Sequence, residues 1–167
     1  MAFVVPFDGS ELAETALVRA SEFSGVMDER VVAVTVIPKG DTEYAREHGW
    51  IDADEPFDVE SVVTALHERV TELVPVANFR HETVGRYASA GTISKHLRKM
   101  ANEEDASMVF IGSENAGDIV SGISSVGAAV AAEETYDVVI IRNRTQPKVD
   151  ALRDVREHRQ RKSDFYR

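Results

Sequence analysis

Residues 2–10 read AFVVPFDGS, an uninterrupted apolar run that ends abruptly in a turn. The six apolar letters predict a short strand that is buried on both faces. The letters DGS then predict a turn, with Ser10 or Asp8 capping the helix that follows. Apolar residues keep helical spacing from Ala13 onward, and the Ser-Gly pair at 24–25 is expected to end that helix.

The alternation of strand and helix continues along the chain. Further strands are expected at 31–37, 79–84, 108–111 and 138–141. Further helices are expected after Asp58, after Gly91, and from Ser124 or Ser125. This pattern predicts a single α/β domain with an open, five-stranded, mainly parallel sheet and helices on both faces. We expect the strand order 3-2-1-4-5, in which the loops after the first and fourth strands flank the ligand-binding switch point.

One segment departs from this rhythm near the middle of the chain. Residues 39–57 form an acidic excursion, and the stretch 41–60 holds eight acidic residues against one arginine. Tyr44, Trp50 and Phe57 are scattered among these acids. We expect the three aromatic side chains to pack on the surface of the domain. The alternative is that the excursion serves as a lid or a partner-binding loop.

The chain also changes character after Pro147. Residues 148–167 carry seven basic and four acidic residues, a net charge of +3, which leaves −13 for residues 1–147. We therefore divide the chain into a domain of residues 1–147 and a basic C-terminal tail or helix of residues 148–167. A docked helix, a tail that clamps a second subunit and a disordered basic tail all fit this composition.

Composition narrows the class of protein. The chain has 167 residues, no cysteine and a formal net charge of −10. Disulfides and thiol catalysis are therefore excluded, and broad binding to nucleic acid or to acidic membranes is disfavoured. The sequence has neither a signal-peptide pattern nor an apolar run of the ~20 residues that span a bilayer, so we expect a cytoplasmic protein. The acidity fits a salt-adapted cytoplasm or an ordinary acidic protein.

Four stretches together resemble the universal stress protein family. They are VVPFDGS at 4–10, AVTVIP at 33–38, AGTISKHLRKMANEEDASMVFIGS at 90–113 and SSVGAAVAAEETYDVVII at 124–141. The resemblance covers the chain to about residue 142. It implies a five-stranded open α/β fold, a role in stress response and a homodimer joined through the last strand. Some members of that family bind ATP and others do not.

The resemblance also implies a phosphate loop. Members that bind ATP carry Gly, two residues, Gly, nine residues, Gly, then Ser or Thr, and such glycines let backbone N–H groups approach phosphate. This chain keeps the first glycine and the hydroxyl of the pattern but lacks the other two glycines. The positions that match the loop are Gly112, Ser113, Asn115, Ser124, Ser125 and Val126. Asn115 and Ser124 stand where glycines belong. A rival register through Gly117 and Gly127 lacks the hydroxyl and shortens the final helix.

The remaining nucleotide contacts implied by the resemblance lie in the first loop and second strand. Pro6 and Asp8 match first-loop positions, Phe7 lies between them, and Val36 matches a position that packs on adenine. Asp8 could equally be a helix cap, and Val36 a core residue. Because residues 112–141 contain no Lys or Arg, we expect binding of ATP or AMP to be weak at most.

The sequence gives no support for catalysis. It has no serine-nucleophile elbow, no Walker loop and no histidine spacing typical of a metal site, so we expect no catalytic residues and no metal beyond a nucleotide-bound Mg²⁺.

The last predicted strand, Val138-Val139-Ile140-Ile141, is a short apolar edge strand that favours pairing with a second copy. We predict a homodimer that binds an adenine nucleotide, or another small anion, weakly. The alternative is a dimeric interaction module that binds no nucleotide.

Overall fold

The computed structural model describes residues 1–112, 130, 135–143 and 146–165. The strands are β1 (Ala2–Pro6), β2 (Arg30–Pro38), β3 (Asn78–Val84), β4 (Ala106–Gly112) and β5 (Asp137–Ile141). The helices are α1 (Glu11–Met27), α2 (Thr42–Glu47), α3 (Val59–Leu73), α4 (Ala90–Glu103) and α6 (Pro147–Phe165). The short helix predicted from Ser124 or Ser125 lies outside the described residues.

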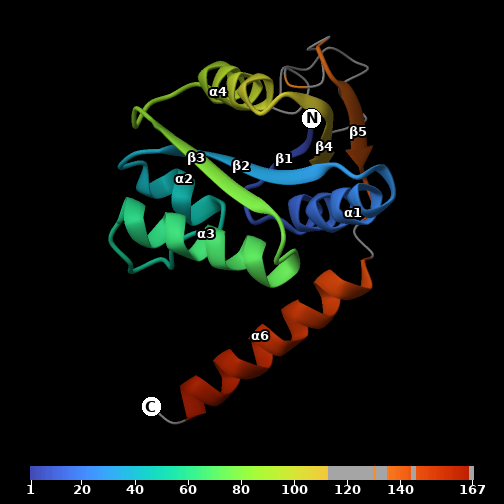
Figure 1. The fold of residues 1–167 in the computed structure, drawn as a ribbon. Coiled ribbons are helices and arrows are strands. Elements are labelled where there is room, and N and C mark those ends of the chain that lie inside the picture. The colour runs from blue at the N-terminus through green and yellow to red at the C-terminus, as the bar shows by residue number, and fades with distance from the viewer. Residues whose placement is uncertain (113–129, 131–134, 144–145, 166–167) are drawn as a thin grey trace.

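The five strands form one parallel sheet in the order β3-β2-β1-β4-β5, which confirms the predicted order. Helices α1 and α3 cover one face and α4 covers the other (Figure 1). On β1, Phe3 and Val5 enter the core on the α1 side, and Val4 enters the core on the α4 side. Both faces of β1 are therefore buried, as its continuous apolar run predicts.

Helix α1 runs further than the sequence predicts. Its N-cap is Ser10, whose side chain accepts a hydrogen bond from the Ala13 N–H at 3.2 Å. The helix passes through the Ser-Gly pair at 24–25, and the Ser24 hydroxyl donates to the Ser21 carbonyl inside the helix. It ends at Asp28, which adopts a left-handed φ of 54°.

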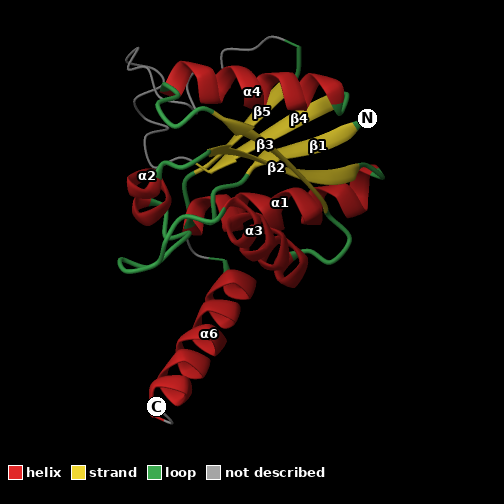
Figure 2. Ribbon diagram, turned by 90° about the vertical axis from the view of Figure 1, so that its left-hand side faces the viewer, coloured by secondary structure: helices red, strands yellow, loops and turns green. Residues whose placement is uncertain are grey.

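Helix α6 has two parts with different surroundings. Its first turns pack on α1 and α3, where Val149 is fully buried and Leu152 contacts the same core. Its later turns extend away from the domain (Figure 2). Of the three alternatives for residues 148–167, a docked helix describes the first part of α6.

Candidate functional site

A cavity of about 180 Å³ lies at the carboxyl ends of the central strands, where the strand order reverses between β1 and β4. Parallel α/β sheets bind their ligands at this point. The lining residues come from the first loop, β2, α1, α4, β4, the acidic excursion and Val130. They are Pro6, Phe7, Asp8, Ala13, Val34, Thr35, Val36, Tyr44, His48, Trp50, Ile93, Leu97, Ile111, Gly112 and Val130.

The first loop is held in place by hydrogen bonds on both sides. The Phe7 N–H donates to Val34 O at 2.8 Å, and the buried Thr35 hydroxyl donates to Phe7 O at 2.5 Å. The Asp8 carboxylate accepts the Ser10 N–H at 2.9 Å. These bonds join the loop to β2 and to the start of α1, so the Asp8 side chain has a fixed position at the cavity.

The acidic excursion supplies an aromatic wall, which we define as Tyr44, His48 and Trp50. The rings of Tyr44 and His48 stack with centroids 4.0 Å apart, and Trp50 lies 5.4 Å from Tyr44 and 5.3 Å from His48. The Trp50 Nε1–H donates to the Asp8 backbone oxygen at 2.7 Å. The wall is therefore attached to the first loop and gives the cavity a flat, apolar side.

Local sequence explains why the wall forms. Asp41 accepts a hydrogen bond from the Tyr44 N–H at 3.0 Å and caps the short helix α2. Tyr44 and His48 are four residues apart, so one turn of helix places their rings over each other. The aromatics thus pack on the domain as expected, but Tyr44 and Trp50 also line the cavity. Phe57 packs against the core on the α1 side.

Carboxylates dominate the charge around the cavity. Burial raises the pKa of the Tyr44 phenol to about 12, and the carboxylates of Asp8, Asp41 and Glu47 add to this rise. Among the described residues that line the cavity there is no lysine and no arginine. Such surroundings favour a neutral or weakly charged ring and oppose a cluster of phosphates.

Gly112 has a packing role at the base of the cavity. A Cβ atom on this residue would clash with Leu12 O and would lie 2.6 Å from the Ala13 N atom. Backbone atoms of α1 cannot move aside easily, so only glycine fits at the end of β4. This role explains the glycine independently of any bound phosphate.

The structure brings together the predicted site residues that it describes. Five of them line the same cavity, namely Pro6, Phe7, Asp8, Val36 and Gly112. The other predicted site residues are outside the described part of the chain: Ser113, Asn115, Ser124, Ser125 and Val126.

Sequence reasoning did not assign Thr35 or the aromatic wall to this cavity. The available signal was the spacing of Tyr44 and His48 beside the single tryptophan of an otherwise acidic stretch. Within the described ranges, no three His, Asp or Glu side chains are grouped to hold a metal ion. No helix in this same part of the chain is long and apolar enough to cross a bilayer.

Solved structures with the same fold include two ligand complexes. One is a universal stress protein in complex with cAMP, with 19% identity and a TM-score of 0.55, covering 84% of this chain and 96% of that chain. Another is the Archaeoglobus fulgidus universal stress protein in complex with dAMP, with 19% identity and a TM-score of 0.52, covering 84% and 97%.

A third similar structure is a universal stress protein family member from Burkholderia pseudomallei. It has 21% identity and a TM-score of 0.54, and the match covers 85% of this chain and 96% of that chain. No curated protein matches the sequence significantly. The sequence model of the universal stress protein family matches residues 1–144. The chain therefore belongs to the universal stress protein family.

Proposed function

We propose that this protein is a stress-response regulator that binds an adenine nucleotide of low charge in the cavity between β1 and β4. The observation that carries the proposal is the cavity itself, which joins the Asp8 carboxylate to a flat aromatic wall at the switch point of the sheet. An adenine ring would lie against Val36 and the wall, and Asp8 would accept a hydrogen bond from the base or the ribose. Structures of the same fold hold cAMP and dAMP, which supports this ligand class.

The charge of the cavity sets the proposed order of ligands. Asp8 lies inside it, no basic side chain is present among the described lining residues, and residues 112–141 contain no Lys or Arg. Each added phosphate would therefore meet uncompensated negative potential. We propose that AMP or cAMP binds more tightly than ATP, and that Mg²⁺ is present only where a nucleotide brings it.

The role proposed is regulatory, in a cytoplasmic homodimer joined along β5. In the described sheet β5 is an edge strand that pairs with β4 on one side. Edge strands with apolar side chains tend to pair with a second copy. A bound nucleotide would then act as a signal and not as a substrate.

The experiment uses Trp50, the single tryptophan of the chain, as an internal fluorescent probe of the cavity. Purified protein is titrated with AMP, cAMP and ATP while its emission is followed. The expected result is a saturable change with AMP or cAMP and a weaker one with ATP. Ligand at ten times Kd should also stabilise the fold by about 1.4 kcal/mol, which raises Tm by about 3–6 °C.

A variant that fills the cavity gives the control. V36F places a larger side chain on a buried lining residue, whereas V76F makes the same change at a site that is 81% exposed. V36F should abolish the emission change and V76F should keep it, with both folds checked by circular dichroism. No response of emission or Tm to millimolar AMP, cAMP or ATP would contradict the proposal and favour the interaction module.

A further inference from the structure

The C-terminal helix carries a basic half that its own domain does not cover. Residues 148–157 hold three basic and three acidic residues, whereas residues 158–167 hold four basic residues and one acid. The net positive charge of the tail therefore lies entirely in its second half. We call the described part of that half, residues 158–165 of α6, the distal arm.

The first half of α6 is fixed to the domain by specific contacts. Arg153 Nη2 donates to Glu14 Oε1 at 2.7 Å, and Glu14 is buried on α1 beside Arg69 of α3. Arg156 Nη2 contacts Glu72 Oε2 at 3.1 Å, and Gln146 Nε2 contacts Glu22 Oε1 at 3.2 Å. A buried carboxylate between two guanidinium groups sets the direction in which the rest of α6 leaves the domain.

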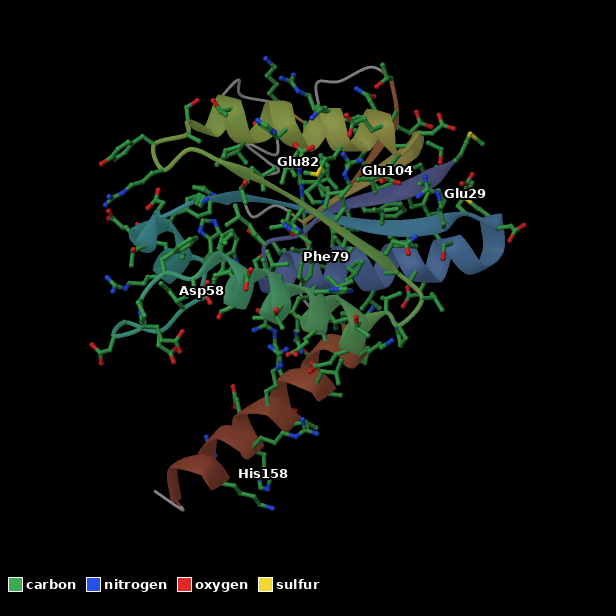
Figure 3. The ribbon with its side chains drawn as sticks, turned by 60° about the vertical axis from the view of Figure 1, so that its left-hand side comes forward. Glu29, Asp58, Phe79, Glu82, Glu104 and His158 are labelled. Atoms are coloured by element: carbon green, nitrogen blue, oxygen red, sulfur yellow. The ribbon has the colours of Figure 1, made fainter. Side chains whose placement is uncertain are left out.

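The distal arm lies clear of the domain, as His158 shows in Figure 3. The side chains of Arg159, Arg161 and Lys162 are exposed. Across the part of the chain that the structure describes, none of these three forms an ion pair. Val155, beside the arm, is 48% exposed. The distal arm and Val155 therefore expose three unpaired cations and one apolar side chain that the described part of the chain does not cover.

The charge distribution of the chain indicates which partner the distal arm binds. Residues 1–147 carry −13, and the densest part of that charge is the stretch 41–60, which we call the acidic segment, with eight acids and one arginine. Seven of these acids are exposed, namely Glu43, Glu47, Asp52, Asp54, Glu55, Asp58 and Glu60. A second copy carries the same negative domain, but its acidic segment concentrates seven exposed carboxylates that match the three cations of the arm.

We infer that the distal arm of one chain docks on the acidic segment of a second copy of the same chain. Arg159, Arg161 and Lys162 pair with exposed carboxylates of that segment, and Val155 covers apolar surface at the edge of the contact. Because the acidic segment also carries the aromatic wall, the arm of one copy lies beside the ligand cavity of the other. This contact is separate from pairing along β5 and does not depend on a bound nucleotide.

The absence of cysteine allows a direct test with the full-length chain. R161C introduces a single thiol in the arm, which is labelled with a thiol-reactive benzophenone and photolysed. Protein mixed from ¹⁴N and ¹⁵N chains separates crosslinks between copies from those within a copy. The expected products are mixed-isotope crosslinks from position 161 to residues 41–60. V26C, at a site 85% exposed on α1, is the matched control and should give no crosslink to that segment.

Charge-reversal variants test the contact independently, through the strength of self-association. R159E/R161E/K162E should weaken self-association about tenfold or more, because like charges then face each other. K39E/R86E/K95E reverses three other exposed basic residues, so it changes the net charge equally and should have little effect. D52K/D54K/E55K should also weaken association, and mixing it with R159E/R161E/K162E should restore contact between the two variants.

Specific results overturn the inference. Crosslinks from position 161 found only within one chain would show that the arm folds back on its own domain. Equal loss of association in the K39E/R86E/K95E control would show a general charge effect. Binding of a DNA duplex or phosphatidylserine vesicles that R159E/R161E/K162E abolishes, without mixed-isotope crosslinks, would assign the arm to a different partner. A failed nucleotide titration leaves these outcomes unchanged, so the two proposals are tested separately.

Discussion

The Trp50 indole donates its Nε1–H to the backbone oxygen of Asp8 at 2.7 Å, across 42 residues of sequence. This bond joins the acidic excursion to the loop that follows β1. The carboxylate of the same Asp8 accepts from Ser10 N–H. One residue therefore holds the wall of the cavity through its backbone and remains available to a ligand through its side chain.

Removing that bond should loosen the wall. W50F keeps an aromatic ring but loses the donor to Asp8 O, and the unfolding free energy should fall by about 1–2 kcal/mol. Urea denaturation followed by circular dichroism measures this change. Y87F is the control, because Tyr87 is 89% exposed and should be neutral. Equal stability of W50F and the wild type would show that the bond does not hold the excursion.

Gly112 offers a second test, because its replacement should disturb packing. In G112A the new methyl group would meet Leu12 O and the Ala13 N atom, so we expect a loss of about 1–3 kcal/mol. G25A is the matched control, since a Cβ there meets nothing within 4 Å and alanine should stabilise α1 by about 0.5 kcal/mol. Urea denaturation would measure both changes in the free energy of unfolding. A neutral G112A would contradict the packing role.

The core of the fold could be predicted from sequence because its signals are local. Phe3 and Val4 belong to one continuous apolar run, and such a run indicates a central parallel strand. The turn at Asp8 and a cap at Asp8 or Ser10 follow from residue type, and the structure identifies Ser10 as the cap. Alternation of these strands with amphipathic helices then restricts the topology, and the predicted strand order is confirmed.

The wall of the cavity could not be predicted, and the docking of α6 stayed one of three alternatives, because both depend on contacts between distant residues. Trp50 meets Asp8, and Arg153 meets Glu14 across 139 residues. Glu14 is buried although glutamate is usually exposed, and no local pattern identifies its two arginine partners. For Gly112 the sequence suggested phosphate, while the structure gives a steric reason in the backbone of Leu12.

Acid should destabilise the protein partly through Glu104. The hydrogen bond from Arg30 lowers the pKa of Glu104 below 4.5, burial opposes this effect, and Arg80 adds to the lowering. The unfolded chain therefore takes up a proton at higher pH than the folded chain does. The stability that the carboxylate contributes is present above pH 4.5 and is lost as the pH falls through the folded pKa.

The variant E104Q tests this sign. It should lower the unfolding free energy by about 1 kcal/mol at pH 7, and it should lose less stability than the wild type between pH 5 and pH 3. E60Q, at an exposed residue, serves as the control and should follow the wild-type curve. Parallel curves for E104Q and the wild type would show that Glu104 does not carry the acid sensitivity.

Pairing along β5 can be separated from docking of the arm by one substitution. Ile140 is half-buried on this edge strand, and I140K places a charge where a second β5 would lie. We expect light scattering to give twice 18.4 kDa for the wild type and a shift toward 18.4 kDa for I140K. V26K, at an exposed site, should keep the wild-type mass.

The two association surfaces predict different patterns across the variants. If I140K lowers the mass while R161C still crosslinks between copies at high concentration, both contacts exist and the edge strand is the stronger one. If I140K keeps the doubled mass and R159E/R161E/K162E loses it, the edge-strand proposal is wrong and the distal arm holds the copies together. A wild-type protein that remains at 18.4 kDa across the accessible concentration range would contradict both.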